Sequence, residues 1–424
     1  MFLFALMSFV QRTSIAVAAD TMMPVLHISQ VQIGWLNTAF LMTYAIMQIP
    51  GGVLGQYLGA RRTYVAVGIV SLLATVATPA LSIIYDGAAL FVGLFVAQLI
   101  LGVSLAPVFP VFASVVETWF PTNRWAIANG LQSCGMLLGG CVTPIAVVSL
   151  TQAVGWRMAL LLAALPVALV TMGWGWYGRS LPRQHPSVTA EELAELDSAA
   201  HDQVTPLTLR RLGRIAADRD VLLLSFSYLC MNYTFYLLTY WSFLYLVQVR
   251  GFKGIESGVM GMVPWIGAAI GAAVGGFLSD RLVERWGARW GYRLVPLISL
   301  TAVAALLLLT IWVSRPYAAV LALAAAFGAV EINEGAYWAA TMHVARSDSG
   351  AATGVLNTGG NLGGILCQPI VAALSAAGAW DAAFRTGTIL ALVAAGAWML
   401  IDADRTVPLP TASVHKEGTP STQK

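Results

Sequence analysis

Charge is what this sequence has least of. Only 10% of its 424 residues are Asp, Glu, Lys or Arg, whereas a soluble domain carries about 25%. Hydrophobic residues make up 58% of the chain, and the mean hydropathy is +0.75. The scarcity of charge therefore predicts that most of the chain lies in a lipid bilayer, and the net charge of +3 gives no reason to expect a nucleic-acid partner.

Cysteine and the common ligand motifs are also scarce. The four cysteines fall within apolar runs, where they act as small core residues, and the five histidines show no metal-ligand spacing. The sequence has no Walker motif, dinucleotide fingerprint or paired CxxC. It also has no pairing of a nucleophile with a base. We therefore expect no metal, no other cofactor, no ATP-driven or redox chemistry, and no enzymatic activity.

Long apolar runs are abundant instead, and each is about 20 residues, enough to cross a bilayer as a helix. We place twelve, at 2–23, 34–57, 63–84, 89–118, 125–150, 157–178, 221–249, 257–279, 294–313, 317–344, 350–376 and 381–402. This pattern predicts an all-α membrane protein. We expect an N-terminal six-helix bundle at 1–178, a cytoplasmic linker at 179–220, a C-terminal six-helix bundle at 221–402 and a disordered cytoplasmic tail at 403–424.

The polar segments indicate how the chain is oriented. Lys and Arg gather in the even-numbered loops and the C-terminal tail; the odd-numbered loops hold only Arg157, Arg250, Lys253, Arg315 and Arg385. The positive-inside rule then predicts a multi-pass protein of the cytoplasmic (inner) membrane with both termini in the cytoplasm. No cleavable signal peptide is visible, and the true start could lie upstream of Met1.

One segment of the linker has its own helix signal. The stretch TAEELAELDSAA, residues 189–200, predicts a short surface helix with Thr189 as its N-cap and acidic residues in its first turn.

The two halves of the chain repeat one another at a constant spacing. GLQSCGMLLGG from Gly130 matches GVLNTGGNLGG from Gly354, GGVLGQ from Gly51 matches GGFLSD from Gly275, and Trp156 matches Trp380. The residue numbers differ by 224 in all three pairs, and we call this difference the repeat offset. These matches indicate duplication of a six-helix unit. Parallel six-helix repeats are the plan of major facilitator transporters, which bind substrate between the halves. The glycines also predict close helix packing, which is compatible with transport.

Eight stretches spread over nearly the whole chain carry a family resemblance. They are RTSIAVAAD, FLMTYAIMQIPGGVLGQYLGARR, APVFPVFASVVETWFP, WAIANGLQSCGMLLGGCVTP, GWRMALLL, RSLPRQHPSV, SDRLVERWGARWGYR and GVLNTGGNLGGILCQP. Together they resemble the anion:cation symporter family of the major facilitator superfamily, which includes bacterial sugar-acid transporters and vesicular organic-anion transporters. The resemblance implies the major facilitator fold and uptake of organic anions driven by protons or sodium.

The resemblance also implies roles for individual residues. Arg12 matches the arginine of the first span that meets the substrate carboxylate, and Tyr44 matches a cavity tyrosine of the second span. Trp338 matches a tryptophan near the substrate in span ten, and Asn357 matches a polar contact in span eleven.

The chain departs from the family where acids are expected. Gln11 stands where the family usually has an acid before the span-one arginine, and Gln98 and Leu105 stand where it often has Arg and Glu in span four. Gln56 and Tyr57 replace the acid and base of the first cytoplasmic loop, although Asp280 and Arg281 keep them in the second half. Losing both N-half acids puts the usual route of proton coupling in doubt.

Ionisable residues inside a membrane are functional-site candidates because they are costly to bury there. Arg12 is the only basic residue mid-span in the N-terminal half. Its guanidinium group can hold a carboxylate with two parallel hydrogen bonds. The alternative is a structural arginine paired with helix carbonyls or with an acid.

Span seven presents a polar face to the same cavity. Tyr228, Asn232, Tyr236 and Tyr240 are spaced by four, so they share one face of a helix. Tyr236 follows Arg12 by the repeat offset, which predicts that it faces the cavity at the same depth. The alternative is ordinary helix packing, with Tyr240 in an aromatic belt at the membrane surface.

Span ten holds two acids. Glu331, Glu334 and Trp338 are spaced three and four apart and form one stripe. A carboxyl group there can gain and lose a proton as the cavity opens to each side, so span ten is a candidate for the coupling role that Gln11 and Leu105 cannot fill. The alternative for both glutamates is a helix-packing pair or a water-filled vestibule.

Two further groups complete the candidate site. Gln98 and Asn361 are uncharged polar residues within spans, equally suited to lining the cavity and to joining helices. Residues at cytoplasmic loop ends are expected to form the inward gate: Arg61, Arg62, Asp280, Arg281 and Arg289.

The sequence thus favours a monomeric secondary active transporter of a small carboxylate with H+ as the coupling ion. The same fold allows an exporter, an exchanger or a uniporter, and a receptor that senses a ligand without moving it is a third possibility. The substrate itself is not specified: an aromatic carboxylate and a sugar acid fit the predicted residues equally.

Overall fold

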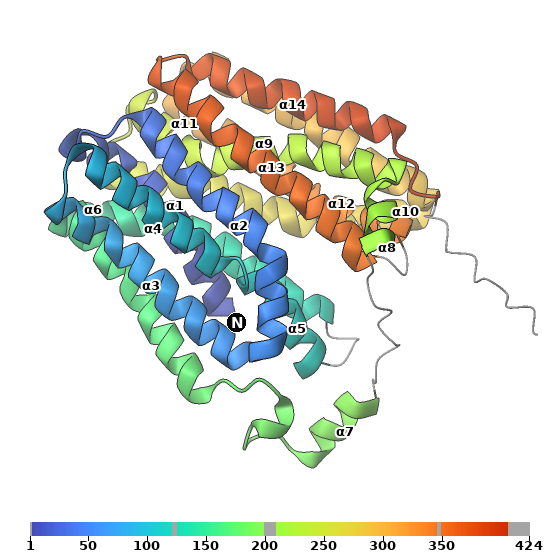
Figure 1. Ribbon diagram of the computed structural model, residues 1–424. Helices are drawn as coiled ribbons and strands as arrows, with labels where there is room; N and C mark the ends of the chain where they lie inside the picture. The colour runs from blue at the N-terminus through green and yellow to red at the C-terminus, as the bar shows by residue number, and fades with distance from the viewer. Residues whose placement is uncertain (1, 121–124, 199–208, 346–348, 406–424) are drawn as a thin grey trace, which may run out of the picture.

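The computed structural model describes residues 2–120, 125–198, 209–345 and 349–405, which fold almost entirely into helices (Figure 1). The helices are α1 (Phe2–Leu26), α2 (Gln30–Leu58), α3 (Ala60–Ile84), α4 (Gly87–Leu105), α5 (Val108–Trp119), α6 (Trp125–Tyr177), α7 (Ala190–Ser198), α8 (Leu209–Ala216), α9 (Arg219–Gln248), α10 (Gly254–Trp312), α11 (Pro316–Glu331), α12 (Glu334–Ala345), α13 (Ser349–Ala376) and α14 (Trp380–Leu400), with a 3-10 turn, η2, at Pro182–Gln184. Two of them bend sharply at a glycine with positive φ: α6 at Gly155 (φ 81°) and α10 at Gly287 (φ 76°). Each of these two helices therefore crosses the membrane twice.

The described helices account for the twelve predicted crossings. Ten stretches are long and apolar enough to span a membrane by length and composition. One of the ten, Gln132–Tyr177, contains the bend at Gly155 and makes two crossings. The twelfth is α13, which lies between α2 and α9 in the bundle. The prediction of an all-α, multi-pass membrane protein is confirmed.

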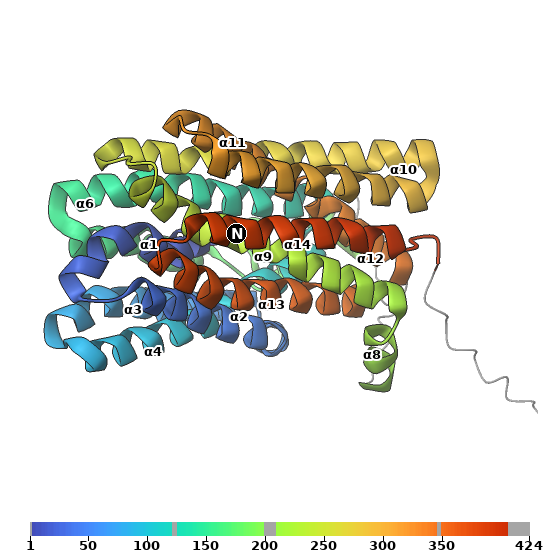
Figure 2. The same ribbon diagram turned by 90° about the horizontal axis from the view of Figure 1, so that it is seen from above.

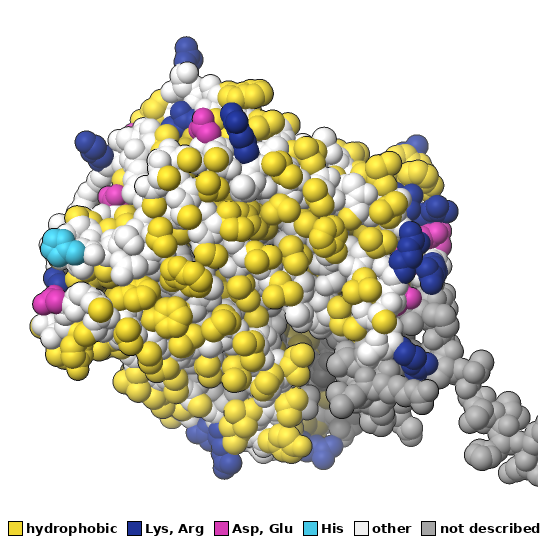
Figure 3. Space-filling model, turned by 45° about the horizontal axis from the view of Figure 1, so that its top comes forward, with side chains coloured by type: hydrophobic (Ala, Val, Ile, Leu, Met, Phe, Trp, Pro, Cys, Tyr) yellow, Lys and Arg dark blue, Asp and Glu magenta, His cyan; other side chains and the backbone are white. Residues whose placement is uncertain are grey.

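The surface matches a lipid environment. Figure 3 shows hydrophobic side chains over the broad face of the molecule, with Lys and Arg at its margins. Large apolar residues such as Ile49, Ile83, Leu169 and Trp312 are more than half exposed. A water-soluble protein would not present so large a continuous apolar surface.

The duplication seen in the sequence recurs in the packing. Gly139 on α6 touches Leu6 and Phe9 of α1 so closely that a side chain there would overlap them. Gly363 on α13, its counterpart at the repeat offset, touches Leu229 and Tyr233 of α9 in the same manner. Small residues allow this approach of backbones in lipid, so each half uses its glycine-rich helix to receive its first helix.

The two halves meet mainly through α2 with α13 and α6 with α10, the pairs that lie side by side in Figure 2. A β-carbon at Gly34 would overlap that of Ala372, and one at Gly258 would lie 3.0 Å from Cα of Ile145. Gly34 and Gly258 are related by the repeat offset, and both lie near the odd-numbered loops. The halves are therefore in close contact on that side.

A buried polar cluster joins the halves at the same place. Gln368 Oε1 on α13 accepts hydrogen bonds from Asn37 Nδ2 of α2 (3.2 Å) and from Trp241 Nε1 of α9 (3.0 Å). The Gln368 side chain is fully buried. Its carbonyl oxygen thus has donors from both halves, which seals this end of the interface.

The fourth span of each half runs through as one membrane-length stretch, Gly87–Val116 and Pro316–Ala345, as predicted at 89–118 and 317–344, but its regular helical hydrogen bonding is interrupted for two residues. Between α4 and α5 the break falls at Ala106–Pro107, because proline lacks the N–H that continues a helix. Between α11 and α12 it falls at Ile332–Asn333. The Asn333 amide donates to the carbonyls of Ala329 (2.8 Å) and Val330 (3.2 Å), and so offers the backbone an alternative partner.

The linker contains the predicted surface helix. In α7, Thr189 Oγ1 accepts from the Glu192 backbone N–H (3.2 Å), and the Glu192 carboxylate accepts from the Thr189 backbone N–H (2.9 Å). This reciprocal pair is a capping box, and the prediction of Thr189 as the N-cap is confirmed.

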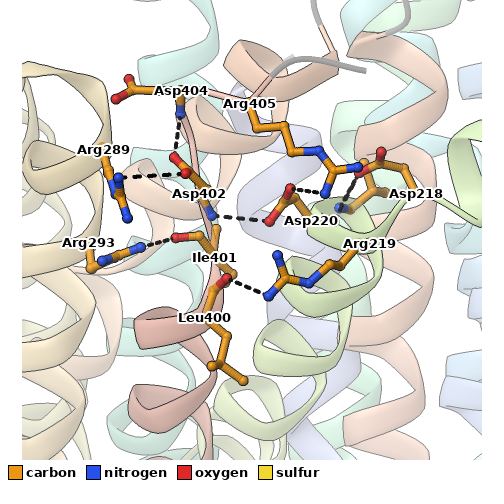
Figure 4. A network of polar contacts seen from close by, with 11 residues as sticks. Asp218, Arg219, Asp220, Arg289, Arg293, Leu400, Ile401, Asp402, Asp404 and Arg405 are labelled. Carbon is orange, nitrogen blue, oxygen red and sulfur yellow. Dashed lines mark hydrogen bonds and ion pairs between the residues drawn. The ribbon is translucent and has the colours of Figure 1, made fainter. Parts of the chain in front are cut away.

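The chain after α14 is held against the C-terminal half (Figure 4). Asp220 is fully buried; its Oδ1 accepts from the Asp402 backbone N–H (3.1 Å), and its Oδ2 lies 3.6 Å from Arg405. Arg293 donates to the Ile401 carbonyl. Of the tail predicted from 403, residues 403–405 are described and belong to this clamp, whereas 406–424 lie outside the described residues.

Candidate functional site

Arg12 lies in a cage of aromatic rings at the junction of the two halves. Its Cζ is 5.0 to 6.0 Å from the ring centroids on both sides of that junction. The rings belong to Phe9, Phe40, Tyr44, Tyr236 and Tyr240. Ring faces attract a cation, so the cage holds the guanidinium charge without an acidic partner.

The hydrogen bonds of Arg12 leave part of its guanidinium group free. Nε donates to the Tyr240 hydroxyl at 2.9 Å, a contact that joins α1 to α9. Nη2 is buried and has no hydrogen-bond partner in the described part of the chain. The two sequence alternatives for a structural arginine, pairing with helix carbonyls or with an acid, are not what the described residues show. An unpartnered buried donor is costly, and a bound anion would satisfy it.

A small cavity opens beside the cage. Arg12, Tyr44 and Leu105 border it, together with Ser8, Phe9, Phe40 and Phe109. Tyr236 faces Arg12 from α9, as the repeat offset predicts. The structure therefore brings together Arg12, Tyr44 and Tyr236 from the candidate set, and their role in binding stays a prediction.

Polar residues of α13 extend this cluster. Tyr236 donates to Asn361 Oδ1 (3.4 Å), Asn361 donates to the Asn357 carbonyl (3.0 Å), and the Asn357 side chain donates to Gln48 of α2. Asn357 and Asn361 thus lie beside the cage and link the halves once more. Gln98, by contrast, is buried in α4, and none of the contacts seen among the described residues connects it to Arg12.

A second polar cluster lies at the break between α11 and α12. Glu334, the first residue of α12, accepts from the Tyr228 hydroxyl (2.6 Å) and from Trp338 Nε1 (2.8 Å) through the same oxygen, Oε1. Tyr228 and Tyr236 are eight residues apart on α9, so the two clusters are separated by roughly 12 Å along that helix.

Glu331 lies on the other side of the same break, as the last residue of α11. Its side chain is 6% exposed and forms no hydrogen bond with the residues that the structure describes. The two carboxyl groups interact electrostatically with each other. The break thus places two acids together, where charge on one raises the cost of charge on the other.

Two positions at which the family usually or often has an acid, 11 and 105, hold neutral, buried side chains here. Gln11 is buried, and its Nε2 donates to Thr75 Oγ1 at 2.9 Å. Leu105 is buried at the end of α4. Among the contacts described for Gln11 and Leu105, therefore, no acid stands in for the missing ones, whereas Glu331 and Glu334 lie within the membrane-length stretch Pro316–Ala345.

The predicted gate residues lie at the linker side of the molecule. Arg61 donates to the Gly175 carbonyl, with Nε at 3.0 Å, and Arg289 lies 3.8 Å from Asp402. Arg281 stacks on Phe277, and Arg62 is exposed. The side chain of Asp280 lies outside the described residues. Where these contacts are described they stay within one half, so a gate between halves would have to form in another conformation.

Three site residues were missed or misplaced by the sequence argument. Tyr240 bonds Arg12 and is 2% exposed, so it does not belong to a surface belt. Tyr228 was placed on the cavity face but not assigned to Glu334, and Gln48 was not singled out. The four-residue spacing along α9 was the available signal for both tyrosines, but spacing does not identify a partner on another helix.

Comparisons with known proteins agree with this architecture. Residues 1–287 match the Major Facilitator Superfamily. A probable sulfoacetate transporter of Cupriavidus necator is 26% identical over 415 residues, covering 95% of this chain and 92% of the relative. The hexuronate transporter of Bacillus subtilis is 25% identical over 63% of this chain and 60% of its own length. A probable galactarate/D-glucarate transporter of Escherichia coli is 24% identical over 60% of this chain and 58% of its own length.

Solved structures share the fold at low sequence identity. A bacterial homologue of the human lysosomal transporter Spinster, inward-facing and occupied, superposes with a TM-score of 0.73 at 17% identity, over 96% of this chain and 95% of the other. The nucleoside transporter NupG superposes with a TM-score of 0.66 at 15% identity, over 94% and 98% of the two chains. The twelve-helix fold, the duplicated halves and the match over residues 1–287 lead to one conclusion: this chain belongs to the major facilitator superfamily, a family of transporters and not of enzymes.

Proposed function

We propose that this protein is a secondary active transporter of a small organic anion, with H+ as the coupling ion. The observation that carries the proposal is the Nη2 of Arg12, buried and unpartnered at the junction of the halves. A carboxylate is the group whose geometry best fits a guanidinium fork. The three relatives compared above are named for sulfoacetate, hexuronate and galactarate or glucarate, all of them organic acids.

Alternating access follows from how the halves meet. Close backbone contacts between them lie near the odd-numbered loops, at Gly34 and Gly258, beside the buried Gln368 cluster. We infer from the distribution of Lys and Arg that these loops lie outside the cytoplasmic membrane and that both termini lie in the cytoplasm. The described state is then closed to the outside, and a monomer contains the complete pathway.

Proton coupling is assigned to Glu334, with Glu331 as its neighbour. Glu334 lies next to the two residues, Ile332 and Asn333, at which the regular hydrogen bonding of this membrane-length stretch is interrupted. Its Oε1 is held by Tyr228 and Trp338, whereas Oε2 has no partner among the described contacts. The carboxyl group can therefore exchange a proton without losing its position.

Glu334→Gln is expected to separate exchange from accumulation. Glutamine mimics the permanently protonated side chain, so the variant should still bind substrate and exchange it across the membrane. It should fail to accumulate substrate against its gradient when only a pH gradient drives it. The measurement is counterflow and pH-driven uptake in proteoliposomes, using an organic acid selected by a thermal-shift screen.

Glu331→Gln is the matched control, because it makes the same change three residues away across the break. Its carboxyl group has no hydrogen bond to a described residue, so we expect a smaller loss of pH-driven uptake. If Glu334→Gln accumulates substrate as well as the parent protein does, span ten is not the coupling element.

An exchanger, exporter or uniporter of the same fold is the second candidate. The observation in its favour is Gln11, which is neutral and already bonded to Thr75 where the family usually has an acid. Counterflow without any response of the parent protein to pH or sodium jumps would favour this candidate. A ligand that binds but shows no counterflow would favour a sensor.

A further inference from the structure

We propose that the site selects monoanions and rejects dianions, so that the substrate is a monocarboxylate with an uncharged body. This inference rests on the proposed function and narrows its substrate class. It concerns the number of negative charges that a bound substrate can carry. The names of the relatives leave this number open, because the acids for which they are named carry one or two anionic groups.

The first argument is the number of available cations. Among the described residues, Arg12 is the arginine that borders the cavity with a free guanidinium nitrogen. Other arginines are bonded elsewhere within their own half: Arg61 to Gly175, Arg157 to Ser82, Arg250 to Val313 and Arg293 to Ile401. A second anionic group of a bound substrate would therefore have no second arginine among the described residues that line the cavity, and an unpaired buried charge is costly.

The second argument is what surrounds Arg12. On one side lie the rings of Phe9 and Phe40, which cannot solvate a carboxylate. On another side each amide of Asn357 and Asn361 already uses one of its two N–H donors, on Gln48 and on the Asn357 carbonyl, so at most one N–H of each is left. Hydroxyl groups of a substrate can exchange into this network, since they both donate and accept, whereas a carboxylate can only accept.

The third argument is the acid at the far end of the site. Tyr228, which bonds Glu334, and Tyr236, which faces Arg12, lie on one face of α9 and are roughly 12 Å apart along the helix. A second carboxylate reaching along this face approaches Glu334. Two like charges about 12 Å apart at an effective dielectric constant of about 20 reduce affinity roughly tenfold, and closer approach reduces it more. If Glu334 is protonated the repulsion ends, but the second carboxylate still lacks a cation.

The test uses matched pairs of acids that differ by one carboxylate. The pairs are D-glucuronate with D-glucarate, D-galacturonate with galactarate, and benzoate with terephthalate, titrated calorimetrically into the purified full-length protein at neutral pH. In each pair that binds, we expect the monoanion to bind at least tenfold more tightly. In Glu334→Gln the ratio should fall, because the repelling carboxylate is gone. Glu256→Gln is the control: this acid, at the start of α10, accepts from the Tyr317 hydroxyl at the start of α11 and does not border the cavity, so the ratio should not change.

The outcomes separate the two proposals. A dianion that binds as tightly as its matched monoanion overturns the monoanion inference and leaves organic-anion transport standing. An unchanged ratio in Glu334→Gln overturns the part assigned to Glu334. Absence of binding by every member of all three pairs overturns the proposed function together with the inference drawn from it.

Discussion

Alanine in place of Arg12 is expected to weaken binding of the organic anion by roughly 30-fold to several thousand-fold, the equivalent of about 2–5 kcal/mol for truncating one partner of a buried, hydrogen-bonded charge pair, and lysine is expected to weaken it by less. Lysine keeps the positive charge but loses the planar fork that can hold both carboxylate oxygens. It also loses the Nε–H that donates to Tyr240. Calorimetric titration of the organic acid into the purified variant gives the affinity directly.

Arg157→Lys is the matched control for this change. Arg157 also stacks on an aromatic ring, that of Trp156 at 4.6 Å, and donates from Nε to a hydroxyl group, that of Ser82. It borders neither the ring cage nor its cavity. Arg157→Lys should therefore leave affinity unchanged, and an Arg12→Ala variant with the parent's affinity would remove Arg12 from the site.

Tryptophan at Gly34 or at Gly258 is expected to trap the transporter with its odd-numbered-loop side open and to reduce uptake to background. Even a single β-carbon at Gly34 would overlap Ala372 of the other half, and one at Gly258 would lie 3.1 Å from the Pro144 carbonyl oxygen. A packed interface cannot absorb an indole ring without separating. Labelling of a cysteine placed at Gln368 with a membrane-impermeant thiol reagent should rise severalfold in either variant.

Gly173→Trp and Gly396→Trp serve as controls for the size of the side chain. A β-carbon at Gly173 or Gly396 meets no atom within 4 Å. These variants should transport normally and keep position 368 protected. Protection of position 368 in Gly34→Trp would contradict the assignment of this interface as the closed side of the described state.

The fold was largely predictable because membrane helices leave a strong signal. Apolar runs gave the twelve crossings, and the repeat offset paired the two glycine-rich stretches, in which Gly139 and Gly363 make equivalent close contacts. The same offset placed Tyr236 opposite Arg12. The periodicity of apolar residues indicates which face of a helix is buried, and the duplication indicates which residues lie at equivalent depth. The predictions about the glycines and about Tyr236 needed only these two kinds of information.

The partners within the site were less predictable, because they depend on how separate helices are placed. The bond from Arg12 to Tyr240 joins residues 228 positions apart, and the spacing along α9 could not distinguish it from a bond to Tyr236. The break that separates Glu331 from Glu334 was also missed. Positions 332 and 333 are Ile and Asn, and neither is a proline or glycine that would indicate a break in the sequence. The break instead involves the Asn333 side-chain amide, which donates to carbonyls of α11.

The fourth span shows how far the symmetry between the two halves extends. The break at Ala106–Pro107 in one half and the break at Ile332–Asn333 in the other nearly coincide once the repeat offset is applied. A proline interrupts the first and an asparagine the second. The two halves thus share the shape, although different residues interrupt the helix in each. The C-terminal half places two acids, Glu331 and Glu334, beside its interruption, whereas the neighbours of the N-terminal one, Leu105 and Val108, are apolar. The pseudo-symmetry of the fold therefore does not extend to the charge of this segment.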